Sequence, residues 1–411
     1  MKLNHILTLC FLLVLLASCR KEEFMPEPEG EKVPYSEINT SLKQAITASP
    51  YTIFKAAWER SNLDKILKEK NDKTPFTVLV PTDEAFIADG LTLEKIKQTE
   101  PALLDSILLY HVLTGNYNPD DFIGREDNFM AKSLLQNSFL KVKPVISGAS
   151  LFDPYFYIQA LKLAGKSLFI NGKAAGEFTP TQTKNGVLWP INKVLHQPRK
   201  TILQVLEEDG RFGMYLELNE RADAWYQELT SYIIQRNFKD GMVVADIGYY
   251  NITFSSIFAI TDDAFHQAGF ETVDELMELN NRNPLPYVDW DTYSVKGGFA
   301  TDTLIGYHRW GTSFAPYDPS YGGGVKNISN FYTNDLNNVL LSDYTLVTAG
   351  FTSFVSPYIM PLDFGKEAGQ VTVKVKGSDY PPAKIIEGDI NTLMGPVHIV
   401  DRLILPRGFK L

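Results

Sequence analysis

Cysteine is almost absent from this sequence. Only Cys10 and Cys19 occur among the 411 residues, and both lie near the N-terminus. A disulfide within the residues that follow is therefore excluded, and so is a thiol nucleophile or a zinc site that needs thiolates. Six histidines are present, but no two of them have the spacing of metal ligands on a helix or in a hairpin. We expect no metal and no cofactor.

Recognisable catalytic motifs are also missing. The sequence has no G-x-S-x-G turn for a serine nucleophile. Gly322-Gly323-Gly324 is not followed by the Lys-Ser/Thr of a phosphate loop and indicates a flexible turn instead. Paired carboxylates for glycoside hydrolysis need no fixed spacing, so the 49 acidic residues alone leave that class open.

Positive charge is in deficit. Lysine and arginine together number 39 against 49 acidic residues, which gives a formal net charge of −10 at pH 7. This balance argues against nucleic acid and against anionic lipid surfaces as partners. With 44% hydrophobic and 21% charged residues, the composition is that of a globular body, and the length is typical of two domains. After the N-terminal segment, no apolar run is long enough to span a membrane.

The N-terminal segment has the pattern of a signal peptide. Lys2 supplies a positive charge, residues 6–16 are almost wholly apolar, and Ala17 and Ser18 precede Cys19. The segment resembles a bacterial lipoprotein signal peptide. The resemblance implies that residues 1–18 are removed and that Cys19 carries acyl chains, which anchor the protein to a membrane.

A charged tether follows the expected anchor. Lys21, Glu22 and Glu23 resemble the export tag that sends Bacteroidetes lipoproteins to the outer face of the outer membrane, although a solvated tether of no further meaning fits as well. Residues 25–34 are rich in proline and glutamate and indicate a stiff spacer. We therefore assign residues 19–35 to a lipidated tether and expect the protein to face the cell exterior.

The remaining chain contains an internal repeat. Residues 77–86 read as a buried strand that runs into a short helix, and residues 256–265 repeat this pattern. In each copy a threonine is placed to cap the helix, an aspartate follows in the first turn, and a phenylalanine faces the core. These residues are Thr82, Asp83 and Phe86 in the first copy and Thr261, Asp262 and Phe265 in the second.

A Tyr-His pair forms the second repeated element. Tyr110-His111 ends an apolar helical period that begins after Pro101, and the counterpart is Tyr307-His308. Each pair follows an apolar helical face. This placement favours a hydrogen-bonded histidine inside the core over an exposed functional one.

A turn followed by a strand closes each copy. The first copy has this element at residues 185–195 and the second at residues 394–406. The second contains His398 and Asp401, whereas the first has Trp189 in place of the histidine.

These three ordered elements resemble the fasciclin domain, twice over. The family pattern has a Pro-Thr-Asp-x-Ala-Phe box, a Tyr-His pair and a closing Asn-Gly-Val-x-His-x-Ile-Asp strand. Trp189 and the replacement of the box proline by Ile260 depart from it. The resemblance implies an α+β fold with two tandem fasciclin-like domains, residues 36–198 and 199–411. Each is expected to be a β-sandwich or wedge with helices packed at one side.

The sequence agrees with that order of elements. Helical patterns at residues 51–67 and 201–221 come first in their halves. Strand-like runs follow at residues 134–143, 167–170, 339–348 and 370–376.

Residues 284–324 are unusually rich in aromatic side chains and glycine. Loops carry function more often than core elements do, and such aromatics suit sugar stacking or protein contacts. A local core that packs this long insertion is the alternative. The candidate ligand platform consists of Trp290, Tyr293, Trp310, Phe314, Tyr317 and Tyr321.

We therefore expect a non-enzymatic cell-surface lipoprotein that mediates adhesion to an extracellular protein or matrix ligand, as the fasciclin resemblance implies. In animal matrix members of that family, the Tyr-His segment is linked to integrin adhesion. The alternative is an accessory lipoprotein of an outer-membrane polysaccharide-uptake system, which binds glycan or docks onto the transporter.

Overall fold

The structure is a computed structural model. It describes residues 38–70, 74–142, 153–232, 242, 245–246, 250–252, 254–310, 314–316, 330–348 and 356–411. Residues Thr40–Leu411 form one compact unit, separate from Met1–Asn39. Along the described chain, no helix combines the length and the apolar character needed to cross a bilayer.

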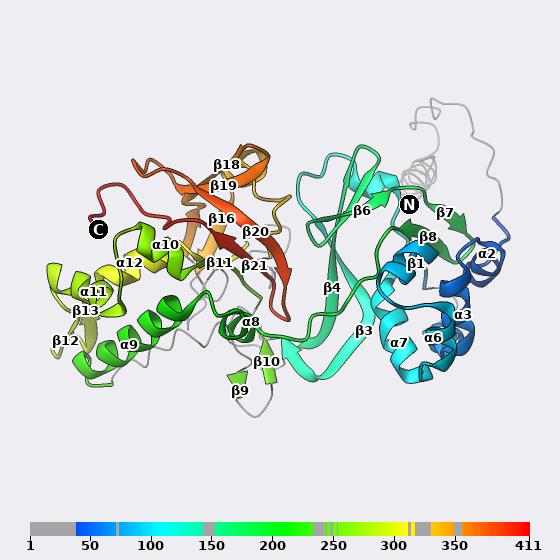
Figure 1. The fold of residues 1–411 in the computed structure, drawn as a ribbon, viewed down its shortest axis with the longest axis horizontal. Coiled ribbons are helices and arrows are strands. Elements are labelled where there is room, and N and C mark those ends of the chain that lie inside the picture. The colour runs from blue at the N-terminus through cyan, green and yellow to red at the C-terminus, as the bar shows by residue number, and fades with distance from the viewer. Residues whose placement is uncertain are drawn as a thin grey trace, which may run out of the picture. The chain divides into compact units, whose positions relative to one another are not determined.

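The first half begins with helices and continues with strands, drawn from blue to green in Figure 1. The helices are α2 (Leu42–Ala48), α3 (Thr52–Arg60), α4 (Leu63–Glu69), α5 (Asp83–Ala88), α6 (Leu93–Gln98), α7 (Pro101–His111) and the 3-10 turn η1 (Pro119–Phe122). The strands are β1 (Phe76–Pro81), β2 (Val112–Thr114), β3 (Phe129–Val142), β4 (Asp153–Ala164), β5 (Ser167–Ile170), β6 (Lys173–Glu177), β7 (Thr181–Thr183) and β8 (Gly186–Ile191).

The second half repeats the order with a longer insertion. Its helices are α8 (Ile202–Asp209), α9 (Gly213–Leu229), α10 (Asp262–Gln267), α11 (Val273–Glu278), the 3-10 turn η3 (Leu279–Arg282), α12 (Ala300–Gly306) and α13 (Asn338–Leu341). Its strands are β9 (Ala245–Asp246), β10 (Tyr250–Ile252), β11 (Ser256–Ile260), β12 (Tyr287–Asp289), β13 (Ser294–Lys296), β14 (Arg309–Trp310), β15 (Phe314–Pro316), β16 (Thr345–Thr348), β17 (Ser356–Ile359), β18 (Leu362–Glu367), β19 (Gln370–Val375), β20 (Ala383–Asn391) and β21 (Pro396–Val400).

Both halves are organised around one parallel strand pair. β1 runs parallel to β8 with Leu79 opposite Trp189, and β11 runs parallel to β21 with Phe258 opposite His398. Every residue of β1 and β11 is buried, as near-continuous apolar strands in a covered parallel pair should be. The two registers agree with the sequence repeat, because Trp189 and His398 hold the same place in the closing strands.

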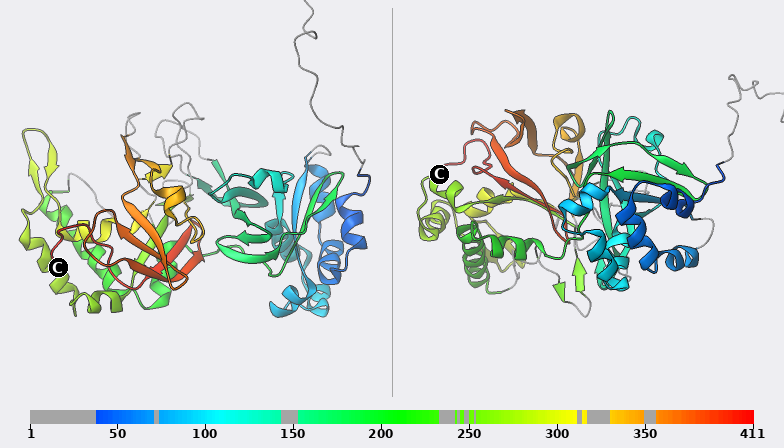
Figure 2. Two further views of the ribbon diagram at one scale, coloured as in Figure 1. Left: turned by 90° about the horizontal axis from the view of Figure 1, so that it is seen from above. Right: turned by 45° about the vertical axis from the view of Figure 1, so that its right-hand side comes forward.

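Two larger sheets extend from these pairs. The first has the strand order β6-β5-β4-β3-β2-β1-β8-β7, and the second has β14-β11-β21-β20-β19-β18. β15, β16 and β17 form a small antiparallel sheet. β12 and β13 form a separate hairpin near α9 and α11, coloured yellow-green in Figures 1 and 2. The mixed α+β class predicted from the sequence is confirmed.

Three predicted elements differ in detail. The helical segment at residues 51–67 is interrupted at Ser61, so that α3 and α4 are separate helices. The segment at 201–221 is broken at Gly210, whose φ of 76° ends α8 in the left-handed conformation that glycine tolerates. The expected strand at 339–348 begins as helix α13, because Asn337 caps it by accepting a hydrogen bond from the Leu340 N–H, and only its last residues form β16.

The two halves share contacts beyond the linker. β10, from the second half, pairs in parallel with the end of β3, with Ile252 opposite Val142. The Tyr155 hydroxyl donates to the Leu393 carbonyl at 2.8 Å, and its ring stacks on Phe254 at 6.2 Å between centroids. The domain ranges 36–198 and 199–411 stay a prediction, and these contacts cross that boundary.

The repeated phenylalanines should matter equally for stability. Phe86 is 1% exposed and Phe265 is fully buried, so Phe86→Ala and Phe265→Ala should each lower the free energy of unfolding by about 3–5 kcal/mol. Urea denaturation followed by circular dichroism measures this loss. Ile87→Ala is the matched control, since Ile87 is 57% exposed. A loss below about 1 kcal/mol at either phenylalanine would contradict the repeat alignment.

Candidate functional site

The threonine and aspartate of each box cap two different helices. Thr82 Oγ1 accepts from the Ala85 N–H at 3.2 Å, and Thr261 Oγ1 accepts from the Ala264 N–H at the same distance. Asp83 reaches further and accepts from the Ile53 N–H at 2.9 Å, at the start of α3.

The second copy repeats this longer contact. Asp262 accepts from the Met214 N–H of α9 at 2.8 Å. Neither α3 nor α9 has a side-chain cap from its own N-cap residue. The aspartates therefore satisfy orphan N–H groups of an upstream helix. The sequence predicted these aspartates only as residues in the first turn of their own helices. The absence of a capping side chain just before α3 and α9 was the one sign that these helices need a cap from elsewhere in the chain.

Both histidines of the Tyr-His pairs are completely buried. His111 Nδ1 donates to the Ile107 carbonyl at 2.8 Å, while its Nε2 accepts from the Leu195 N–H at 2.9 Å. His308 Nε2 accepts in the same way from the Ile404 N–H at 3.0 Å. Each histidine thus joins its helix to the chain just beyond the closing strand of its half. Neither ring is accessible to a partner molecule.

The tyrosines of these pairs have different surroundings. Tyr110 is buried, and its ring packs edge-on against Tyr157 at 5.7 Å between centroids. Tyr307 is half-buried and packs against the core of the second half that contains Phe331. The copies have therefore diverged at this position even though the histidines have not.

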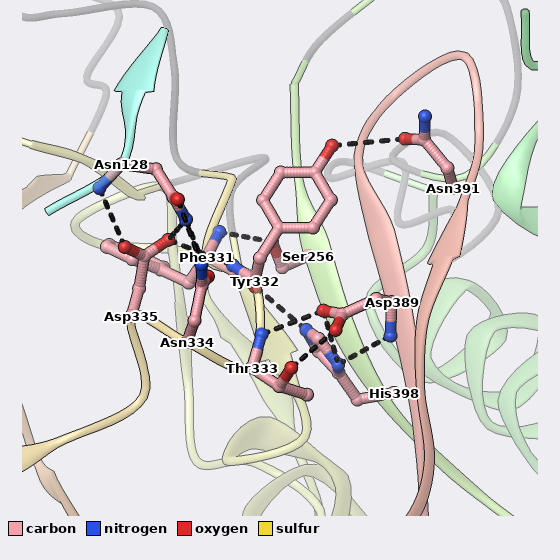
Figure 3. A network of polar contacts seen from close by, with 10 residues as sticks. All are labelled: Asn128, Ser256, Phe331, Tyr332, Thr333, Asn334, Asp335, Asp389, Asn391 and His398. Atoms are coloured by element: carbon pink, nitrogen blue, oxygen red, sulfur yellow. Dashed lines mark hydrogen bonds and ion pairs between the residues drawn. The ribbon is translucent and has the colours of Figure 1, made fainter. Parts of the chain in front are cut away.

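His398 lies in a buried polar network, which Figure 3 shows from close by. Its Nε2 donates to the Phe331 carbonyl at 2.8 Å, and its Nδ1 accepts from the Asp389 N–H at 3.3 Å. The Asp389 carboxylate accepts from the Thr333 N–H at 2.7 Å and from the Thr333 hydroxyl. Burial lowers the pKa of His398. The network therefore holds the 331–333 segment against β20 and β21.

The same segment continues to a junction between the halves. Asp335 accepts from the Asn128 N–H at 2.9 Å and from the Asn128 amide at 2.5 Å (Figure 3). Burial raises the pKa of Asp335 to about 6, against the effect of these hydrogen bonds. Lys162 donates to the Asn334 carbonyl at 2.9 Å beside it. Sequence spacing gave no sign of this junction, because its two sides come from different halves.

Asp401 and Trp189 each stabilise the closing strand of their own half. Asp401 accepts from the Lys384 N–H at 2.7 Å and so fastens β20 to the end of β21. Trp189 is 1% exposed and contacts Phe178, with ring centroids 4.7 Å apart. The replacement of histidine by tryptophan in the first half thus substitutes apolar packing for the polar network of the second.

The structure divides the candidate platform among separate elements. Trp290 and Tyr293 lie on the β12–β13 hairpin, where they are 58% and 75% exposed. The backbone of Trp310 pairs with Ser256 in the larger sheet, and Phe314 lies in β15. Tyr317 and Tyr321 lie outside the described residues, as do Cys19, Lys21, Glu22 and Glu23.

The histidines of the repeated elements are engaged in contacts inside the protein. All are buried, and each accepts or donates hydrogen bonds within the protein. Within the part of the chain that the structure describes, no cluster of three or more His, Asp or Glu side chains is placed to hold a metal ion. Among the candidate residues whose exposure the structure describes, the most accessible are Trp290 and Tyr293 of the hairpin.

Residues 49–198 match the family model of the fasciclin domain. Fasciclin domains are typically binding modules without catalytic activity. The solved structure of a FAS1 domain pair from the insect cell adhesion molecule fasciclin I matches at 14% identity, covering 86% of this chain and 95% of that one, with a TM-score of 0.30. No curated protein matches the sequence. The second half repeats the first in its parallel strand pair and in the hydrogen bond to its buried histidine.

The buried histidines should make stability depend on pH. Burial lowers the pKa of His111 to about 4 and that of His308 to about 3, from 6.5. Between pH 6.5 and these values the unfolded chain binds protons that the folded chain does not, so stability falls as the pH is lowered. Each histidine contributes a slope of up to about 1.4 kcal/mol per pH unit.

His111→Gln should remove part of this slope, because an amide can replace both hydrogen bonds without titrating. Urea denaturation at a series of pH values between 7.5 and 4.5 measures it. His266→Gln serves as the control, since His266 is exposed and should leave the slope as in the wild type. An unchanged slope in His111→Gln would show that His111 does not carry the effect.

Proposed function

We propose that this protein is a non-enzymatic, lipid-anchored surface protein that binds an extracellular protein or matrix ligand through the β12–β13 hairpin. The exposure of Trp290 and Tyr293 carries this proposal. Large aromatic side chains are costly to leave in water and are enriched where proteins contact partners. Tyr287, which is 56% exposed, begins the same hairpin and extends the aromatic surface.

The hairpin presents these rings in a fixed geometry. Trp290 and Tyr293 meet edge to face, with centroids 6.2 Å apart and planes at 85°. The Asp289 carboxylate accepts from the N–H groups of Asp291 and Thr292 and so closes the turn that carries both rings. Tyr293 adopts a φ of 49°, a region that side chains other than glycine rarely occupy. Such local constraint is typical of a recognition loop.

The Tyr-His pairs do not support an adhesive role of their own. Tyr110, His111 and His308 are buried, and both histidines accept hydrogen bonds from the backbone. An adhesive contact at these residues would require the helix to separate from the sheet. The hairpin needs no such rearrangement.

The hairpin rings should be dispensable for folding and needed for binding. Trp290→Ala and Tyr293→Ala should each weaken ligand binding by about 1–3 kcal/mol and leave the melting temperature within a few degrees of the wild type. Phe139→Ala is the control, because Phe139 is 79% exposed but belongs to β3 of the first half. A large loss of stability in either hairpin variant would favour the local-core interpretation and contradict the proposal.

The choice of ligands in the binding assay should also distinguish the two candidate functions. Immobilised extracellular-matrix proteins and a panel of polysaccharides are each tested with the mature chain. Binding to a matrix protein that Trp290→Ala weakens supports adhesion. Binding to a polysaccharide alone supports the accessory role in glycan uptake, for which the favouring observation is the exposed ring of Trp290, a surface on which a sugar can stack. The absence of binding to both panels would contradict a ligand site at the hairpin.

The membrane anchor has a direct test. Cys19→Ala should abolish incorporation of a labelled fatty acid and release the protein from the membrane fraction, because the acyl chains supply most of the membrane affinity. Replacement of Lys21, Glu22 and Glu23 by alanine is the matched variant. It should keep the lipid but protect the protein from protease added to intact cells. Label in Cys19→Ala would refute the anchor, and unchanged digestion of the triple variant would refute the export tag.

A further inference from the structure

Trp290 and Tyr293 meet at nearly a right angle on the β12–β13 hairpin. Their ring planes are inclined at 85°, and their centroids lie 6.2 Å apart. The register of the hairpin places Asp289 opposite Ser294, so Trp290 and Tyr293 are the next pair toward the turn. Both side chains are more than half exposed. We call this pair the aromatic corner.

The aromatic corner has the geometry of a cation site. A positive group in the angle between two perpendicular rings lies near both, and attraction to a ring face extends to about 6 Å from its centroid. In the described chain the cation–π pairs are formed by Phe129, Phe156 and Phe212, so no lysine or arginine of the protein covers either ring of the corner. The corner is therefore open to a cation from another molecule.

The charge around the aromatic corner is negative. Residues 262–310 contain nine aspartates and glutamates against three lysines and arginines. This acidic excess equals more than half of the net charge of −10 that the whole chain carries. A surface of one sign attracts an oppositely charged partner and repels one of like charge.

Two of these carboxylates adjoin Trp290 in the chain. Asp289 precedes it and Asp291 follows it, whereas Lys296, the one basic residue of the hairpin, lies at the other end, opposite Tyr287. Neighbouring Cα atoms are about 3.8 Å apart, so both carboxylates lie at a distance from the corner comparable with the Debye length of about 10 Å at 0.1 M salt. Their attraction for a cation in the corner is consequently only partly screened.

The two carboxylates differ in what they contact. Asp289 accepts hydrogen bonds from the N–H groups of Asp291 and Thr292 and so shapes the turn. The Asp291 carboxylate itself makes no hydrogen bond or ion pair among the residues that the structure describes. Its charge is therefore available to a partner, and its replacement leaves the hydrogen bonds of the turn in place.

We infer that the aromatic corner binds an arginine- or lysine-rich segment of an extracellular protein. One cationic side chain lies between the rings of Trp290 and Tyr293, and Asp291 pairs with a second cation of the same segment. A neutral ligand would gain nothing from the acidic surroundings, and an anionic polysaccharide would be repelled by them. The inference rests on the proposed function, because it names the chemistry of the partner at the same hairpin.

Binding of octa-arginine and octa-citrulline peptides to the immobilised mature chain tests this inference. Citrulline has nearly the shape of arginine without its charge. In biolayer interferometry at about 50 mM NaCl, octa-arginine should bind saturably and about tenfold or more tightly than octa-citrulline. Its affinity should fall as NaCl is raised to about 300 mM, because salt screens the attraction.

Substitutions of Trp290 separate a cation–π contact from simple apolar burial. Trp290→Leu keeps a large apolar side chain but removes the ring face, so it should weaken octa-arginine binding by about three- to tenfold. Trp290→Phe keeps a ring face and should retain most of the affinity. Asp291→Asn should weaken binding severalfold, whereas Glu94→Gln, which removes one exposed charge from the first half, should bind as the wild type does.

Equal binding of the two peptides would overturn the inference. So would wild-type affinity for octa-arginine in Trp290→Leu, or equal weakening in Asp291→Asn and Glu94→Gln. In each of these cases the hairpin is still a ligand site if Trp290→Ala weakens binding to a matrix protein. Failure of this inference is therefore distinguishable from failure of the proposed function.

Discussion

The arrangement of each half depends on one buried hydrogen bond, from a backbone N–H beyond the closing strand to a histidine at the end of a helix. Leu195 donates to His111 in the first half and Ile404 donates to His308 in the second. In both halves the strand that carries the box runs parallel to the closing strand. A parallel pair requires a long crossover, which the elements between its two strands form, whereas α2, α3 and α4 in the first half and α8 and α9 in the second precede the pair. The histidine joins the crossover to the chain just beyond the closing strand.

Much of this arrangement could be predicted from local sequence. The threonine caps, the burial of Phe86 and Phe265, and the pairing of the two boxes follow from short patterns whose physical causes lie within one turn of chain. The reach of Asp83 to the start of α3 could not be predicted in the same way, because its partner Ile53 lies 30 residues upstream, outside the turn that the pattern describes. The junction of Asn128 with Asp335 was beyond sequence reasoning, since two polar residues in distant segments give no periodic signal.

Both halves contain the buried hydrogen bond to the histidine, and they differ in the residues around it. His398 uses hydrogen bonds to Phe331 and Asp389, whereas Trp189 fills the equivalent place by packing. Tyr110 is buried and packs against Tyr157, while Tyr307 is half-buried and packs against the core that contains Phe331. The shared positions therefore explain the fold, and the divergent ones are where binding properties specific to this chain arise. Site residues chosen by the repeat alone are consequently biased toward the core.

Strand β10 has a consequence for synthesis of the chain. It belongs to the second half by sequence but covers the open edge at the end of β3 in the first. During translation the first half emerges before β10 does, and for that interval β4 covers only one side of the end of β3, so the edge of residues 140–142 that faces β10 has no neighbouring strand. Exposed strand edges of this kind are templates for association with other chains. By pairing with this edge, the second half therefore protects the first half from association with other chains. A truncated product that lacks β10 is expected to aggregate more readily.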